Sequence, residues 1–383
     1  MLLNSYASVL ERIMPSANQE LYLDLVEQQS TIDGRFANPK RLGYQGGGGN
    51  FSLLFRATDL TTRRGVALKF YNPDQMNDSY RWQSFLREEE ILRGLAGQSD
   101  IVGWVGPRSE FIVPVSLSSG STYNFQFNYF SLELASHSVG AVIAQDWWNI
   151  EQRLIAFRAM CRAVQRIHSL RIAHRDLKPE NFLVMPDERV VLSDFGAARD
   201  FNSTRSALIG KYWGPPGDLS YTAPEMLACL HDSRPEIAFG TDFYALGAIL
   251  FEFFSGTQLV HQLFSQNDIG TLINIMSTVQ QEKRADIYHQ IIRDIVIAHP
   301  LPSLGVFRAS VPACIRSQID ILYRSMAALD YRNRAADFQS IFRQINICLI
   351  ILRNEAEYRR RIEMKRQRQA ARHIALVTRG GSL

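Results

Sequence analysis

The feature that most constrains this chain is a dense group of charged and polar residues at positions 174–181, followed by a second short motif at 194–196. The first motif reads His174-Arg175-Asp176-Leu177-Lys178-Pro179-Glu180-Asn181, and the second reads Asp194-Phe195-Gly196. Between them, the apolar run 190–192 predicts a short strand that leads into Asp194. Carboxylates, a lysine and an amide at this density would be costly as core filler. The fold must therefore gather these groups at one polar site.

The residue types in these motifs suit the transfer of a phosphoryl group. That reaction needs a base near the attacking hydroxyl, oxygen ligands for Mg2+, and cations against the developing charge. Asp176 supplies a carboxylate, Lys178 a cation, and Asn181 an amide within one short segment. Asp194 adds a second carboxylate, and Gly196 frees the backbone just after it.

Taken together, the pattern His-Arg-Asp-x-Lys-x-x-Asn and the Asp-Phe-Gly motif resemble the eukaryotic-type protein kinase family. The lysine two positions after the aspartate is similar to that of the serine/threonine branch. The resemblance implies an α+β fold of two lobes, a small antiparallel-sheet lobe with one helix and a larger helical lobe. It also implies that Asp176 is the catalytic base and that Lys178 neutralises charge on the γ-phosphoryl group of ATP. By the same resemblance, Asn181 and Asp194 hold Mg2+.

A glycine-rich stretch near the N-terminus resembles the phosphate-binding loop of the same family. Gly47 and Gly49 take the places of the first two glycines, while Ser52 stands where the third is expected. Glycines allow backbone N–H groups to approach phosphates without an intervening side chain. The strand-like run 65–70 then carries Lys69, which resembles the lysine that holds the α- and β-phosphates.

A helix predicted to begin near Asp78 and to end by Gly97 carries the carboxylate expected to pair with Lys69. Glu88 lies on the apolar face of that helix and needs a cation there, so we choose it, with Glu89 as the alternative. This pair would position the nucleotide.

Two strands predicted at 111–117 and 123–134 would complete the small sheet. The residues at the end of the second strand resemble the hinge between the lobes, where backbone groups bind adenine. Leu132 would be the gatekeeper, with Glu133 and Ala135 as nucleotide contacts.

The segment 194–225 resembles the activation segment of the family. Its candidate phosphorylation sites are Ser203, Thr204 and Ser206. Arg175 and Arg199 resemble the arginine pair that receives such a phosphate.

Three other positions complete the resemblance or depart from it. Asp218 stands where serine/threonine kinases usually carry a threonine that contacts the catalytic aspartate and lysine, which bears on the substrate class and the basal activity. Glu225 resembles the carboxylate that pairs with a buried arginine, here Arg334. Asp242 resembles the residue that braces the backbone of the catalytic loop.

Composition adds few constraints. An apolar content of 46% is ample for a core, and the net charge of +4 is small for 383 residues. The four cysteines are scattered among apolar neighbours without a CxxC pair, which favours core positions in a reducing compartment. The N-terminus has no signal-peptide pattern, and the longest apolar run, 347–352, is too short to span a membrane. We expect a soluble, cytoplasmic protein.

The chain divides into three predicted parts. They are a helical N-terminal extension at 1–38, a kinase domain at 39–352 with lobes at about 39–134 and 135–352, and a basic C-terminal tail at 353–383. The tail has nine arginines and lysines between 353 and 379. It is either a solvated helix or a docking element for an acidic partner, nucleic acid or an anionic membrane.

The resemblance implies an ATP- and Mg2+-dependent protein kinase that phosphorylates serine or threonine hydroxyls on protein substrates. Two alternatives stay open. A pseudokinase scaffold would use the fold for binding alone, although each catalytic group is present. A kinase-fold enzyme acting on a small molecule is kept open by Asp218.

Overall fold

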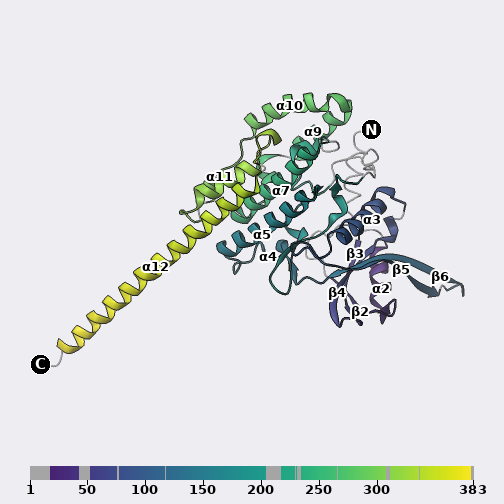
Figure 1. Cartoon of the computed structure of the whole chain (residues 1–383), viewed down its shortest axis with the longest axis horizontal. Coiled ribbons are helices and arrows are strands. Elements are labelled where there is room, and N and C mark those ends of the chain that lie inside the picture. The colour runs from purple at the N-terminus through teal and green to yellow at the C-terminus, as the bar shows by residue number, and fades with distance from the viewer. Residues whose placement is uncertain are drawn as a thin grey trace.

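The structure is a computed structural model, which describes residues 18–42, 52–75, 77–116, 118–203, 217–228, 230, 234–264, 266–307, 311–335 and 337–380. Its body consists of two lobes. A sheet-rich lobe holds the N-terminal part of the chain, a helical lobe follows, and one long helix runs out from the helical lobe (Figure 1). This is the two-lobed α+β architecture that the sequence predicts.

The smaller lobe is built on an antiparallel sheet of six strands of unequal length, in the order β1-β2-β3-β4-β6-β5. Its elements are α2 (Gln19–Glu27), β1 (Thr31–Ile32), β2 (Phe36–Arg41), β3 (Ser52–Asp59), β4 (Arg64–Tyr71), a 3₁₀ turn (Pro73–Gln75), α3 (Ser79–Gly94), β5 (Trp104–Ser116) and β6 (Thr122–Glu133). The strand predicted at 111–117 is the second half of β5, and the strand predicted at 123–134 coincides with β6 to within one residue at each end. β5 starts earlier than predicted, before its own proline-containing stretch.

The sheet carries an aromatic core on the face covered by α2. Phe55, Phe70, Phe127 and Tyr129 are buried there against apolar residues of that helix. Alternation of side chains along a strand places these rings on one face. β1 and the start of β2 lie within 1–38, so the predicted extension is helical only in part among its described residues.

On the other side of the sheet, α3 is fixed at its start by a side-chain cap. The carboxylate of Asp78 accepts hydrogen bonds from the backbone N–H groups of Tyr80 and Arg81, at 3.0 and 3.2 Å. Such a cap satisfies donors that the first helical turn leaves without partners. The helix was expected between Asp78 and Gly97, and it is found there with Glu88 and Glu89 both buried.

The larger lobe is mainly helical. Its strands are β7 (His137–Ser138), β8 (Ile172–Ala173), β9 (Phe182–Val184), β10 (Val190–Leu192) and β11 (Arg199–Asp200). These described strands form two short sheets, one in the order β10-β9-β7 and one that pairs β11 with β8. Its helices are α4 (Val139–Val142), α5 (Ile150–Ser169), α6 (Pro224–Leu227), α7 (Pro235–Ser255), α8 (Leu259–Leu263), α9 (Gln266–Thr278), α10 (Gln281–Ala298), α11 (Arg316–Met326) and α12 (Phe338–Gly380). Single 3₁₀ turns lie at Pro179–Asn181, Phe195–Ala197, Leu304–Val306 and Tyr331–Asn333.

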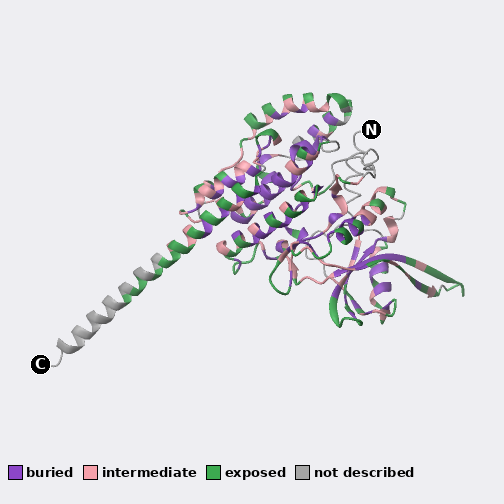
Figure 2. Ribbon diagram, in the orientation of Figure 1, coloured by how far each residue is buried: buried purple, intermediate pink, exposed green. Residues whose placement is uncertain are grey.

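Helix α7 forms the centre of this lobe. It is apolar on all sides, and Figure 2 shows it buried among the other helices. Among the helices of the described residues, α7 is the one with the length and apolar composition to cross a membrane, but 89% of that stretch is buried inside the protein. A helix that is hydrophobic all round is expected at the core of a large domain.

The first half of α12 packs on the helical lobe, and the second half extends away from it (Figure 1). Ile345, Cys348 and Leu349 are buried on the packed half. The guanidinium of Arg353 donates to the carboxylate of Glu151 at 2.8 Å, near the last contact with α5. The helix continues through the boundary predicted at residue 353 without a break.

Candidate active site

The catalytic loop lies between β8 and β9 and is held by a carboxylate from α7. The backbone N–H groups of His174 and Arg175 both donate to Asp242, each at 2.8 Å. Asp242 also contacts the ring of His168 at 2.8 Å, so that histidine is packed at the end of α5. Arg175 adopts a left-handed backbone conformation with φ 65°, which the bonds to Asp242 stabilise. The predicted brace by Asp242 is present.

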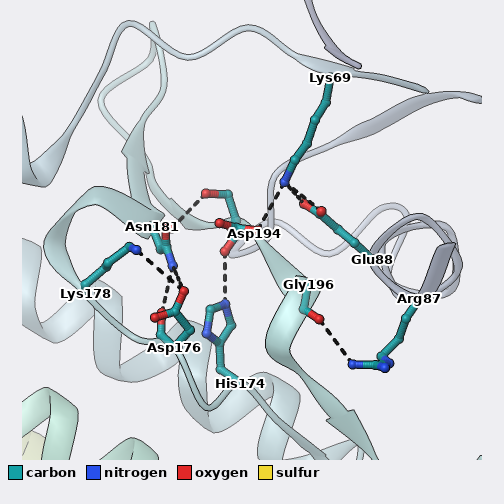
Figure 3. Close-up of polar contacts among 10 residues, drawn as sticks. Lys69, Arg87, Glu88, His174, Asp176, Lys178, Asn181, Asp194 and Gly196 are labelled. Carbon is teal, nitrogen blue, oxygen red and sulfur yellow. Dashed lines mark hydrogen bonds and ion pairs between the residues drawn. The ribbon is translucent and has the colours of Figure 1, made fainter. Parts of the chain in front are cut away.

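Within this loop the three predicted catalytic groups meet. The amide of Asn181 donates to the backbone oxygen of Asp176 at 2.7 Å, and the ammonium of Lys178 lies 3.6 Å from the Asp176 carboxylate. Figure 3 shows all three side chains directed into the same space. A loop of eight residues thus presents a carboxylate, an ammonium and an amide together.

The second carboxylate, Asp194, enters the site after β10. The ring Nε2 of His174 lies 3.0 Å from the carbonyl oxygen of Ser193, so it ties the catalytic loop to the residue before Asp194. Asp194 itself has φ 61°, a left-handed conformation that turns the chain sharply before Phe195. Phe195 is fully buried and anchors this turn.

From the other lobe, Lys69 on β4 reaches down toward these groups. Its ammonium bonds to both carboxylate oxygens of Glu88 at 2.6 Å and to Asp194 at 3.1 Å (Figure 3). The expected Lys69–Glu88 pair is therefore present. Glu89, the alternative, instead accepts a hydrogen bond from the indole N–H of Trp104 at 3.2 Å.

Opposing effects set the charges in this cluster. Burial would lower the pKa of Lys69, but the charges of Asp194 and Glu88 outweigh it and raise that pKa. Burial would raise the pKa of Asp194, but Lys69 and Lys178 outweigh it and lower that pKa to about 2. Burial raises the pKa of Glu88 to about 7, because Lys69 offsets it only in part. The lysine is thus held firmly charged, and Glu88 titrates near neutral pH.

Charges also act on the catalytic loop. Burial raises the pKa of Asp176, with Lys178 opposing the shift and Asp194 reinforcing it. Burial would lower the pKa of Lys178, but Asp176 and the other nearby carboxylates outweigh it and raise that pKa. A carboxylate whose pKa is raised toward the pH of the reaction is a stronger base than an ordinary carboxylate.

The end of the predicted activation segment contacts Asp176, the predicted catalytic base. The backbone N–H of Asp218 donates to Asp176 at 2.8 Å, and the Asp218 carboxylate lies 4.0 Å from the ammonium of Lys178. The preceding Gly217 has φ +91°, and a Cβ there would lie 2.7 Å from the backbone oxygen of Arg175. Only glycine fits that position without displacement of the catalytic loop.

A buried ion pair closes the far side of this segment. Arg334 lies beside Glu225, with a hydrogen bond of 3.1 Å between Nη2 and the carboxylate, and both side chains are almost completely buried. The guanidinium also donates to the backbone oxygens of Gly240 and Ala328. The predicted pair is present, and it joins three separate segments of the larger lobe.

Sequence reasoning missed Arg87, the residue before Glu88. Its guanidinium donates to the backbone oxygen of Gly196 at 3.2 Å (Figure 3) and to that of Ala198 at 3.5 Å. Arg175 likewise donates to the oxygen of Ala197, at 2.9 Å. Burial lowers the pKa of Arg87, and the nearby charge of Arg199 adds to that shift. Arg87, Arg175 and Arg199 therefore gather behind the Asp-Phe-Gly motif. In the sequence, the only signal for Arg87 is that it directly precedes Glu88.

Some predicted positions are placed without a visible role, and others lie outside the described residues. Gly47, Gly49, Thr204 and Ser206 lie outside them. Ser52 begins β3, and Leu132 is buried opposite Ala67 in the sheet. Glu133 ends β6 and its N–H donates to the oxygen of Gly103 at 2.8 Å, while Ala135 follows in the connection between the lobes.

Comparisons with known proteins agree with this geometry. A family model described as the protein kinase domain matches residues 42–344. The chain is 28% identical to mitogen-activated protein kinase 15 of Caenorhabditis elegans over 271 residues, which are 67% of this chain and 50% of that protein. It is 29% identical to mitogen-activated protein kinase 12 of Oryza sativa subsp. japonica over 308 residues, 76% of this chain and 47% of the relative. The chain thus spans about half the length of these curated relatives.

Proposed function

The chain belongs to the protein kinase family, and on that premise we propose that it transfers the γ-phosphoryl group of ATP to serine or threonine hydroxyls of protein substrates. The observation that carries the proposal is the convergence of Lys69, Glu88 and Asp194 with the catalytic loop. Residues from both lobes meet there, as a reaction between a bound nucleotide and a second substrate requires.

In this proposal each group has one task. Asp176 accepts the proton of the acceptor hydroxyl, and its raised pKa keeps it a competent base. Lys178, beside it at 3.6 Å, faces the negative charge of the phosphoryl group in transfer. Lys69, fixed by Glu88, holds the α- and β-phosphates. The family resemblance supplies these roles, and the distances support them.

The residues present also fit a magnesium ion. Asp194 offers a carboxylate with a pKa of about 2, and the side chain of Asn181 offers an amide oxygen while its nitrogen donates to Asp176. Oxygen donors of these two types suit Mg2+, which takes its remaining ligands from phosphates and water. Within the described residues, no group of three His, Cys, Asp or Glu side chains is arranged to hold a metal. When bound, the ion would neutralise phosphate charge.

The same geometry weighs against the two alternatives. A scaffold that only binds nucleotide has no need of a base, whereas Asp176 is held in place by Asn181 and by the N–H of Asp218. A small-molecule substrate does not need the segment 217–225, which here packs against the catalytic loop and is anchored by Glu225 and Arg334.

A labelling experiment tests the proposal. Purified protein is incubated with labelled ATP, Mg2+ and a protein or peptide library, beside the variants Asp176→Ala and Asp194→Ala. Label on serine or threonine that both variants lose is the expected result. Nucleotide binding without transfer would support the scaffold, and label on a small molecule would support the second alternative.

We also propose that phosphorylation of the activation segment orders it through Arg175 and Arg199, with Arg87 alongside. The grouping of three guanidinium groups near Ala197 and Ala198 favours an anion there. Mass spectrometry of the active enzyme should find phosphate on Ser203, Thr204 or Ser206. Active enzyme with all three unmodified would contradict this.

A further inference from the structure

The residue that departs most clearly from the family pattern, Asp218, lies in the part of the active site that a substrate must approach. Its N–H is bonded to the catalytic Asp176, and its side chain is 39% exposed. The acceptor hydroxyl must come within hydrogen-bonding distance of Asp176. The carboxylate of Asp218 is therefore next to the acceptor residue of any substrate.

Asp218 is one of several carboxylates that share a single lysine. The charge of Lys178 acts on Asp176, Asp218 and Glu180. Partial burial raises the pKa of Glu252, and the charges of Glu180 and Asp218 raise it further. Glu252 on α7 accepts a hydrogen bond from the Tyr221 hydroxyl at 2.6 Å, which places it beside the segment that holds Asp218. Counted over the described residues, the substrate side of the site thus carries more negative than positive charge.

In the proposed reaction Lys178 serves the phosphoryl group, so it is not a dedicated partner for Asp218. The ammonium of Lys178 also lies closer to the carboxylate of Asp176, at 3.6 Å, than to that of Asp218, at 4.0 Å. One oxygen of the Asp218 carboxylate accepts a hydrogen bond from the backbone N–H of Ser220 at 2.9 Å, and the other, at 4.0 Å from Lys178, is the one that a basic residue of the substrate would meet. Successive residues of an extended peptide are about 3.5 Å apart, so a basic side chain next to the acceptor residue reaches this carboxylate.

Building on the proposed kinase function, we propose that Asp218 is a specificity-determining residue that selects protein substrates with an arginine or lysine beside the acceptor serine or threonine. A threonine at this position would offer a hydroxyl but no charge. The carboxylate attracts a basic flanking residue and repels an acidic one.

The test compares three peptides that differ only in the residues flanking one acceptor serine, which are arginine, alanine or glutamate. For wild type, kcat/KM should fall in that order, with the arginine peptide about three- to fivefold above the alanine peptide, as expected for a partly exposed charge pair. Asp218→Asn and Asp218→Thr should lose this ratio, and Asp218→Glu should keep most of it. Asp187→Asn, which removes an exposed carboxylate from the β9–β10 turn, should leave it unchanged.

Because Asp218 touches the catalytic aspartate, its variants can lose turnover for all peptides. Binding of the same peptides with the acceptor serine replaced by alanine is therefore measured by fluorescence anisotropy, where the same ratios should appear. The wild-type preference should also shrink as ionic strength rises, because salt screens exposed charges.

The outcomes separate the two proposals. Absence of transfer to every peptide overturns the proposed kinase function. Transfer with an arginine-to-alanine ratio that is one in wild type, or unchanged in Asp218→Asn, overturns the role of Asp218. If Asp218→Asn accelerates all peptides equally, the carboxylate restrains Lys178 and does not select the substrate.

Discussion

At the scale of single residues, the active site depends on positions where the side chain has no freedom to change. Gly217 shows this most clearly, because its backbone is left-handed and an added Cβ would lie 2.7 Å from the backbone oxygen of Arg175. Glu88 shows it electrostatically, because it is buried beside a lysine that must stay charged.

We expect Gly217→Ala to lower kcat at least tenfold while the protein stays folded. The added Cβ would lie 2.7 Å from the oxygen of Arg175 and 3.0 Å from the Asp176 carboxylate, so the base must move. Gly120→Ala is the matched control, since Gly120 has φ +83° but nothing within 4 Å. Steady-state kinetics measures kcat, and thermal denaturation shows whether each variant stays folded. Equal activities of the two variants would contradict the prediction.

The second prediction concerns pH. Glu88, with a pKa of about 7, is charged above that pH and becomes neutral as the pH falls through it. The ion pair with Lys69 is therefore present at pH 8 and largely lost at pH 6, and nucleotide affinity should weaken over that range.

Isothermal titration calorimetry with ADP from pH 6 to 8 measures this effect. The nucleotide itself titrates in the same range, so Glu88→Gln serves as the control and should show only the nucleotide's part. A wild-type profile that coincides with that of Glu88→Gln would show that the pair does not titrate in this range.

At the scale of elements, the helix α2 completes the smaller lobe. It covers the aromatic face of the sheet, and Arg41 on β2 holds it through Glu20 and Glu27 at 2.8 and 2.9 Å. Without α2, this apolar face of the sheet would be exposed to water. The helix therefore contributes to the stability of the lobe that carries Lys69.

Leu23→Ala in α2 should lower the free energy of unfolding by about 2–4 kcal/mol, because Leu23 is buried against the sheet. Leu21→Ala in the same helix should change it by less than about 0.5 kcal/mol, because that leucine is 46% exposed. Urea denaturation of both variants gives the comparison. Similar losses would mean that α2 does not pack as described.

At the scale of the whole molecule, α12 has two halves with different tasks. The first half supplies buried residues to the helical lobe, while the second leaves the body entirely (Figure 1). At about 1.5 Å per residue, its 43 residues measure roughly 65 Å. The projecting half carries most of the basic residues of the predicted tail, and we propose that it is either a solvated helix or a docking element for an acidic partner, nucleic acid or an anionic membrane.

Deletion of residues 354–383 should leave the free energy of unfolding and the kinase activity on peptides nearly unchanged. Deletion of residues 343–383 should destabilise the protein by several kcal/mol, because it removes Ile345, Cys348 and Leu349 from the core. Urea denaturation and peptide kinetics measure both. A large loss in the shorter deletion would show that the projecting half also supports the fold, and unchanged partner binding would favour the solvated-helix interpretation.

The sequence alone determined the local parts of this protein. The catalytic loop, the Asp-Phe-Gly motif and the cap of α3 are encoded in neighbouring residues, because their spacing along the backbone already defines their geometry. The family and the two-lobed fold followed from those motifs. The partners of Asp242 and Glu225 were predicted by resemblance, and the structure contains both contacts.

Only the tertiary structure decided which distant groups touch. Helical periodicity favoured Glu88 and left Glu89 as the alternative. Both are buried, and the packing of α3 on the sheet directs Glu88 to Lys69 and Glu89 to Trp104. The bond from Asp218 to Asp176 and the approach of Arg87 to Gly196 also join segments far apart in the chain. Such contacts depend on how whole elements pack, which the spacing of residues within one element does not specify.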